Sequence, residues 1–253
     1  MDFASVETIN KLKCLYETYR KEHEMGAKVS LFHSTQDSQN AELAKKIDKE
    51  IRLILGHTLA ENFKDYKIVL GAFLVKEPGS GSIVPPHQDW NWTDEQKYFS
   101  CNVWIPLSDT GRINGGLRVV PSSHRIIPTI RPNYNYTWAF EDVVQSIEAH
   151  LIDVDTQVGE CVLIDHSVIH ASYANLASTS RVAAIVTIVP KEANLYHFFC
   201  EDGQTVEKYP VETEDIYHMR YKVKPEYLTS DVSFDYDFPR VNETVFQEWI
   251  KNR

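Results

Sequence analysis

Cysteine is scarce in this chain and follows no recognisable motif. Four cysteines are spread over 253 residues, with no Cys-X-X-Cys pair, at positions Cys14, Cys101, Cys161 and Cys200. This spacing argues against a disulfide framework, which needs a dense and even set of cysteines. Each cysteine is therefore expected to act as a small buried hydrophobe.

Positive charge is in deficit as well. The chain has 26 Lys and Arg residues against 36 Asp and Glu residues, which gives a formal net charge of −10. Proteins that bind nucleic acid or anionic membranes depend on Lys and Arg to neutralise phosphates and lipid head groups. Neither nucleic acid nor a membrane is an expected partner.

Long hydrophobic runs are also missing. Apolar runs such as residues 69–75 and 182–189 are far shorter than the roughly 20 residues of a membrane-spanning helix. The first residues show no basic segment followed by an apolar stretch, which is the pattern of a secretory signal. We therefore expect a cytoplasmic protein.

The patterns that are present predict a mainly β protein with flanking helices. Apolar spacings of three and four predict helices over residues 5–24, 41–59 and 243–250. Short apolar or alternating runs between Gly, Pro and Asn turns predict an antiparallel double-sheet jelly roll. Its strands are expected at residues 66–76, 98–105, 117–120, 161–165, 169–173, 182–189 and 196–200. One domain is expected, with a helical part at 1–60, a core at 66–200 and a C-terminal extension at 209–253.

A candidate metal site lies in the stretch after the first long strand. His87 and Asp89 are two residues apart, so in an extended backbone their side chains project to the same face. His170 is the expected third ligand. Two neutral imidazoles and one carboxylate form the triad that holds non-haem Fe(II) and leaves other positions open. The pattern indicates an iron oxygenase.

An arginine downstream of the triad suggests a co-substrate. An iron site with one carboxylate keeps positive charge and can chelate the keto-carboxylate end of a 2-oxoacid. The far carboxylate then needs a fixed cation, and Arg181 can act as a bidentate donor with the Ser172 hydroxyl as a second donor. We expect the turn at residues 175–180 to bring Arg181 back antiparallel beside His170 and Ser172.

Four sequence blocks together resemble a known family. Lys76-Glu77-Pro78-Gly79, His87-Gln88-Asp89-Trp90, the block from Asn114 to Arg125, and the segment from His170 to Arg181 are similar to the phytanoyl-CoA dioxygenase family of Fe(II)- and 2-oxoglutarate-dependent oxygenases. The resemblance implies a double-stranded β-helix core with iron on the triad. It also implies that Trp104 and Lys76 line the 2-oxoglutarate pocket. Ser122 stands where the family usually has Gly.

Other residues are weaker candidates. Asn102 alternates with Trp104 on the strand face that is expected to look into the polar site, so it is a candidate co-substrate contact. Arg118 could bind a substrate carboxylate if it points inward. Aromatic side chains often line ligand pockets, and five here are candidate substrate contacts: Trp90, Trp92, Tyr134, Tyr136 and Trp138. The last three fall in residues 129–139, which are expected to form a loop or lid.

The predicted function is an oxygenase that uses Fe(II), 2-oxoglutarate and O2. Asp89 occupies the position that halogenating relatives leave to a small residue, which favours hydroxylation of an unactivated C–H bond. We expect a small amino-acid-like or natural-product substrate, free or carrier-bound. Two alternatives stay open: a non-enzymatic jelly-roll binding module, because fold does not fix function, and a cupin-type iron dioxygenase without 2-oxoglutarate. The sequence leaves the oligomeric state and the oxidised position undecided.

Overall fold

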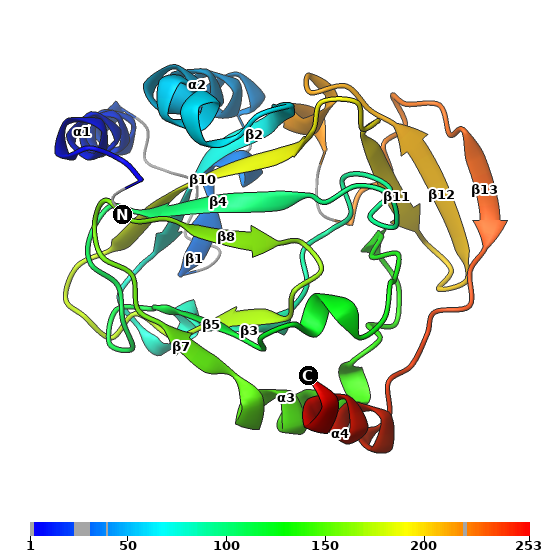
Figure 1. Ribbon diagram of the computed structural model, residues 1–253. Coiled ribbons are helices and arrows are strands. Elements are labelled where there is room, and N and C mark those ends of the chain that lie inside the picture. The colour runs from blue at the N-terminus through cyan, green and yellow to red at the C-terminus, as the bar shows by residue number, and fades with distance from the viewer. Residues whose placement is uncertain (1–2, 23–30, 39, 220–221) are drawn as a thin grey trace.

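Two antiparallel sheets face each other at the centre of the protein (Figure 1). The computed structural model describes residues 3–22, 31–38, 40–219 and 222–253. The five-stranded sheet runs in the order β1 (Phe32–Ser34), β2 (Tyr66–Lys76), β10 (Arg181–Pro190), β4 (Cys101–Pro106), β8 (Val162–Asp165). The four-stranded sheet runs in the order β3 (Val84–His87), β9 (His170–Ser172), β5 (Leu117–Val119), β7 (Ile152–Val154). The predicted double-sheet jelly roll is confirmed.

Two helices cover the outer face of the five-stranded sheet, α1 (Val6–Glu22) and α2 (Ala41–Asn62). The Ser5 hydroxyl accepts a hydrogen bond from the amide of Thr8 at 3.1 Å, which satisfies one of the free donors at the start of α1. Asn40 caps α2 in the same way. Both helices match the prediction, although positions 23 and 24 of the first predicted helix lie outside the described residues.

Strand alternation separates a helix-facing side from an interior side. In β10, Val182, Ala184 and Val186 pack in one apolar cluster with residues of α1 and α2. Because side chains alternate along a strand, Arg181 and Ala183 point the other way, into the space between the sheets. Ala183 packs there with Trp104 of β4. The five-stranded sheet thus presents one apolar face to the helices and one mixed face to the interior.

A third sheet lies beside the open end of the two facing sheets (Figure 1). Its order is β13 (Val232–Asp235), β12 (Thr205–Pro210), β11 (Tyr196–Cys200), β6 (Asn133–Tyr134). Only β11 of these strands was predicted, and β6 lies within the expected loop at residues 129–139. The sequence also gave no prediction of β1, β7 or α3 (Val144–His150).

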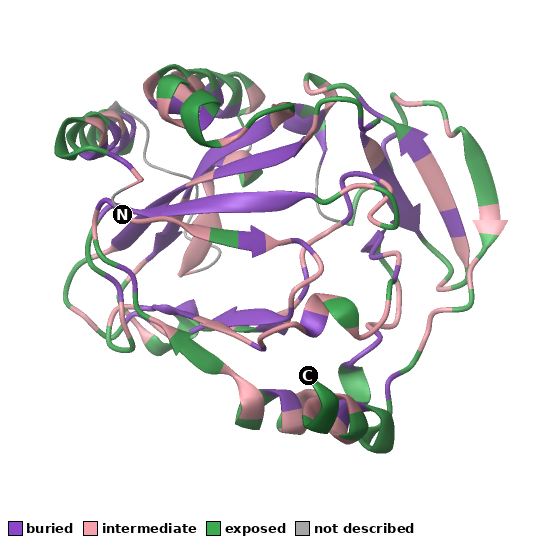
Figure 2. Cartoon of the chain, in the orientation of Figure 1, coloured by how far each residue is buried: buried purple, intermediate pink, exposed green. Residues whose placement is uncertain are grey.

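A helical layer closes the other side. The helices α3 and α4 (Glu243–Asn252) pack beneath the four-stranded sheet (Figure 1). Figure 2 shows buried residues concentrated in the facing sheets and exposed residues on the outer sides of the helices. Within the described residues, no helix combines the length and the apolarity that crossing a membrane requires.

Candidate metal centre

Three potential ligand atoms meet at one end of the four-stranded sheet. His87 is the last residue of β3 and His170 is the first residue of β9, and the two are directly opposed in the antiparallel register. Asp89 follows β3 by two residues. Its Oδ1 atom lies 3.8 Å from His87 Nε2 and 3.9 Å from His170 Nε2. The structure therefore brings the three predicted ligands together.

Backbone carbonyls set the orientation of both imidazole rings. His87 Nδ1 lies 2.9 Å from the carbonyl oxygen of Pro85, and His170 Nδ1 lies 3.1 Å from that of Val168. A carbonyl oxygen only accepts, so each Nδ1 carries a proton and Nε2 is the atom left to face a metal. Burial, with a contribution from His170, lowers the pKa of His87 to about 4. The ring is thus neutral at pH 7, as a metal ligand must be.

The carboxylate is held by a chain of side chains. Asn102 donates from Nδ2 to Asp89 Oδ2 at 2.8 Å, and Asn102 Oδ1 accepts from Thr187 Oγ1 at 2.6 Å. Burial alone would raise the pKa of Asp89, but the facing histidines and Arg131 lower it overall. Oδ2 is therefore engaged while Oδ1 stays directed at the imidazoles. Two neutral nitrogens and one anionic oxygen are a donor set that fits Fe(II).

Arg181 forms a second feature of the interior. Its side chain is buried, with 2% of the residue exposed, and Nη2 donates to the Gly115 carbonyl at 3.1 Å. Nε and Nη1 have no hydrogen-bond partner among the described residues. The guanidinium also lies 5.5 Å from the centre of the Trp104 ring. Buried donors are almost always paired, so these two fit an absent anionic ligand such as a carboxylate.

Lys76 lies next to this arginine. It is directly opposite Arg181 in the β2 and β10 register, and its Nζ donates to the carbonyls of Ser82 at 2.6 Å and Tyr173 at 2.7 Å. Burial and the Arg181 charge lower the pKa of Lys76 to about 7. Gly115 makes this packing feasible, because its φ is +83° and a Cβ there would lie 2.6 Å from Lys76 Cδ.

One predicted relation within the site is wrong. Ser172 and His170 share the interior face of β9, as expected, but Arg181 does not pair beside them. The segment between residues 172 and 181 crosses from the four-stranded sheet to the five-stranded sheet, where Arg181 begins β10 and pairs with Lys76. The arginine and the serine therefore reach the interior from opposite sheets. The sequence pattern could not distinguish a hairpin from a crossing between sheets.

Arg118 does not point inward. Its neighbours Leu117 and Val119 are opposite Ser172 and His170, so Arg118 lies on the outer face of the sheet. There it donates to Glu148 Oε2 at 2.8 Å and lies 4.7 Å from the centre of the Tyr173 ring. Its predicted role as a substrate contact is contradicted by this orientation.

The aromatic candidates separate into different environments. Trp138 donates from Nε1 to Gln88 Oε1 at 3.1 Å, so it contacts the residue between the candidate ligands His87 and Asp89. Trp90 borders a narrow crevice with Arg131. Trp92 packs in an apolar core cluster. Tyr134 and Tyr136 contact Phe199 and Phe238, respectively, in the C-terminal part of the chain.

Two residues near the ligands had no predicted role at the metal. Arg131 is buried and donates from Nε to the carbonyl of Asp89 at 2.5 Å. The His166 carbonyl accepts from the Asp89 amide at 2.9 Å, while its Nδ1 lies 2.9 Å from Ser100 Oγ. Arg131 carries no sequence signal, because it follows no periodicity and lies in a segment expected to be a loop.

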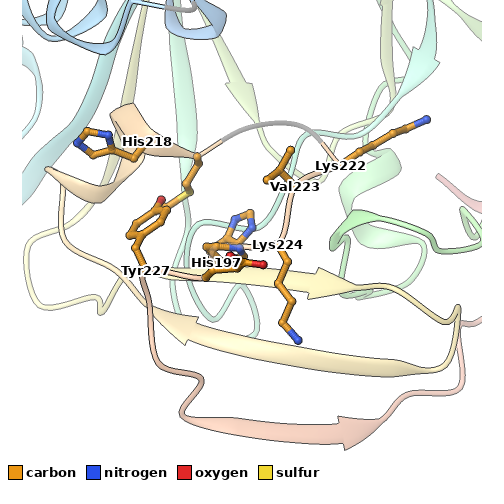
Figure 3. Close-up of a pocket in the computed structure, with 9 residues that line it drawn as sticks. His197, His218, Lys222, Val223, Lys224 and Tyr227 are labelled. Carbon is orange, nitrogen blue, oxygen red and sulfur yellow. The ribbon is translucent and has the colours of Figure 1, made fainter.

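A cavity of about 500 Å³ lies among residues of the third sheet and the C-terminal segment. Figure 3 shows His197 among the residues that line it, with the side chains of Lys222 and Lys224 pointing away from this imidazole. None of the three candidate metal ligands lines it. His197 also borders the crevice that contains Trp90 and Arg131.

Comparison with known proteins agrees with this geometry. The family model for phytanoyl-CoA dioxygenase (PhyH) matches residues 15–183, more than half of the chain. The chain belongs to the phytanoyl-CoA dioxygenase family. A phytanoyl-CoA dioxygenase of Arabidopsis thaliana is 32% identical over 132 residues, which are 49% of this chain and 45% of the relative. The chain thus spans about half the length of the curated relatives it matches.

Solved structures share the fold of this family member. HygX from Streptomyces hygroscopicus, determined with nickel and 2-oxoglutarate bound, has a TM-score of 0.53 at 14% identity and covers 76% of this chain and 81% of its own. The epimerase SnoN, in complex with Fe3+, alpha ketoglutarate and nogalamycin RO, has a TM-score of 0.54 at 16% identity, with 77% and 78% covered. At these identities the likeness supports the double-stranded β-helix fold alone.

Proposed function

We propose that this protein is an Fe(II)- and 2-oxoglutarate-dependent oxygenase. The observation that carries the proposal is the presence of two complementary features between the same two sheets. One is the ligand set of His87, Asp89 and His170. The other is a buried arginine, Arg181, of which two nitrogens have no hydrogen-bond partner in the described part of the chain. Family membership supports the same function. A binding module would have no use for an anion-binding arginine near a metal. A cupin-type dioxygenase without 2-oxoglutarate would bring no carboxylate to Arg181 Nε and Nη1.

Each residue has a defined role in this proposal. His87, Asp89 and His170 hold Fe(II), and Asn102 keeps the Asp89 carboxylate turned toward the ion. Arg181 binds the far carboxylate of 2-oxoglutarate through Nε and Nη1. Ser172 provides a second donor, Trp104 packs against the arginine, and Lys76 lies opposite it on β2: all three line the interior.

Iron held by His87, Asp89 and His170 would supply the oxidation together with O2 and 2-oxoglutarate, which are converted to succinate, CO2 and one hydroxyl group on the substrate. The chain positions the reactants and excludes water from them. The backbone carbonyls hold a proton on each Nδ1, so Nε2 is the atom through which each imidazole would bind the ion. Because Arg181 lies in the interior, its electrostatic attraction for a carboxylate is stronger than it would be in water.

We further propose a small amino-acid-like or natural-product substrate. CoA thioesters carry several phosphates, and these need a cluster of unpaired Lys and Arg residues. Two buried or half-buried arginines are already neutralised by carboxylates, since Arg118 binds Glu148 and Arg131 binds Glu95. The net charge of −10 points the same way.

The test is succinate formation from 2-oxoglutarate by protein loaded anaerobically with Fe(II) and then exposed to oxygen, with and without a small-metabolite pool. We expect the wild type to form succinate and His170→Ala to form none. His124→Ala is the matched control, because this histidine lies in the turn after β5 and contacts Arg125. A wild type that binds neither iron nor 2-oxoglutarate would refute the proposal and favour a binding module.

A further inference from the structure

Arg131 is an arginine buried next to a metal ligand without being a ligand itself. Only 1% of the residue is exposed. Its Nε donates to the carbonyl of Asp89 at 2.5 Å, and Nη1 donates to the carbonyl of Thr129 at 3.0 Å. Its Nη2 donates to both carboxylate oxygens of Glu95, at 2.7 and 2.6 Å. One guanidinium thus joins three separate points of the chain.

These bonds matter because Asp89 lies outside any strand. β3 ends at His87, so no ladder of strand hydrogen bonds fixes the backbone of Asp89. Instead, its amide donates to the His166 carbonyl at 2.9 Å, and its carbonyl accepts from Arg131. Asn102 holds the carboxylate through Oδ2. Arg131 therefore supplies one of three restraints that together direct Oδ1 at the imidazoles.

The burial of Arg131 needs a reason beyond stability. A buried Arg–Glu pair loses the hydration of both charges, and replacing such a pair with apolar side chains is often neutral or stabilising. Glu95 neutralises the charge, but neutralisation does not require contact with a metal ligand. The segment that carries Arg131 also carries Trp138, which donates to Gln88, and Gln88 donates to the Ser167 carbonyl at 2.6 Å. Both residues that follow His87 are thus held by this one segment.

We propose that Arg131 is a positioning residue for the metal ligand Asp89. It fixes the Asp89 backbone so that Oδ1 meets the ion in the geometry set by His87 and His170. It also links the segment of residues 129–138 to the metal centre. The proposal rests on the proposed function, since it assumes that Asp89 binds a metal.

A matched control exists elsewhere in the fold. Arg52 of α2 makes the same types of bond, with Nε donating to both oxygens of Asp48 at 2.8 and 2.7 Å. Its Nη1 and Nη2 donate to the carbonyls of Ile68 at 2.9 Å and Val69 at 2.7 Å. These partners belong to α2 and β2 and include none of the metal ligands. Arg52→Met therefore removes a similar set of bonds without touching the site.

The experiment is an anaerobic titration of the full chain with Co(II), in which binding is measured from the visible ligand-field absorption of the metal. Thermal unfolding of the metal-free proteins is measured in parallel. Removing groups that orient metal ligands usually weakens metal binding about 10- to 100-fold. We expect this loss and an altered Co(II) spectrum in Arg131→Met. Arg131→Lys keeps the charge but cannot bridge all three partners, so its affinity should be intermediate. Arg52→Met should lose thermal stability yet bind Co(II) as the wild type does.

The outcomes separate the two proposals. Wild-type binding with unchanged affinity and spectrum in the Arg131 variants would overturn the positioning role alone. Equal weakening in Arg52→Met would also overturn it, because the effect would then follow global stability. A wild type that does not bind Co(II) would overturn both this role and the proposed function. If Arg131→Met does not fold, the affinity of Arg131→Lys decides between a positioning role and none.

Discussion

Replacing Arg181 with methionine should make the ligand-free protein no less stable while abolishing its response to 2-oxoglutarate. Nε and Nη1 are buried, and no residue that the structure describes accepts a hydrogen bond from either. Each unpaired buried donor costs about 1–3 kcal/mol, so two of them cost about 2–6 kcal/mol. Methionine would lose the bond to the Gly115 carbonyl and the contact with Trp104, each contributing about 1 kcal/mol. The net change is then between about 0 and 4 kcal/mol in favour of the variant.

The same two donors set the expected loss in binding. Hydrogen bonds to charged groups contribute about 1.5–3 kcal/mol each, so losing both should weaken 2-oxoglutarate binding by about 3–6 kcal/mol. A loss of this size is at least about 100-fold in Kd. Wild type at 100 times its Kd should gain about 2.7 kcal/mol of stability from the ligand. At that same concentration Arg181→Met should gain almost nothing.

The assay is thermal unfolding with and without 2-oxoglutarate, on protein loaded anaerobically with Co(II). For a chain of this size, 1 kcal/mol corresponds to about 2–4 °C in Tm. Arg118→Met is the matched control, because Arg118 lies on the outer face of the four-stranded sheet. A variant that is less stable than wild type and still responds fully to 2-oxoglutarate would refute the role of Arg181.

Three further predictions concern the stability of an Asp48 variant, the pH dependence of stability and the activity of an Arg118 variant. Asp48→Ala should lose about 3–5 kcal/mol in urea unfolding, because the buried carboxylate accepts from Arg52, the Gly71 amide and the Tyr217 hydroxyl; a loss below 1 kcal/mol would contradict this. The pKa of Lys76 is lowered to about 7, so between pH 7 and pH 10 the unfolded chain binds a proton that the folded chain does not, and stability rises with pH. The check is the Tm of the wild type and of Lys76→Met between pH 7 and pH 10. If the wild-type Tm does not rise relative to that of the variant, the pKa of Lys76 is not lowered. Arg118→Met should keep succinate formation within about twofold of wild type, since Arg118 lies on the outer face of the four-stranded sheet, away from the candidate site; a larger loss would show that Arg118 does contribute to the site.

Much of the fold could be predicted because its signals are local. The helices α1 and α2 follow from apolar spacing, and β2 and β10 are long apolar runs. The third sheet could not be predicted in full. β12 and β13 are short and carry several polar residues, so pairing with neighbouring strands, rather than local pattern, makes them strands.

The candidate site divides in the same way. His87 and Asp89 could be placed together from their spacing alone, and His170 was added as the ligand that completes a known type of set. The crossing of Arg181 to the other sheet and the outward direction of Arg118 depend on strand pairing, which the sequence does not specify. The position of Arg131 next to Asp89 is set by tertiary contacts with Glu95 and Asp89, and no local sequence pattern predicts these contacts.

The most direct test is a crystal structure of the protein prepared anaerobically with Fe(II) and 2-oxoglutarate, with anomalous data collected at the iron edge. We predict one strong anomalous peak, from an iron ion coordinated by His87 Nε2, Asp89 Oδ1 and His170 Nε2. The far carboxylate of 2-oxoglutarate should lie within hydrogen-bond distance of Arg181 Nε and Nη1. An iron peak at other residues, or 2-oxoglutarate bound away from Arg181, would contradict the account.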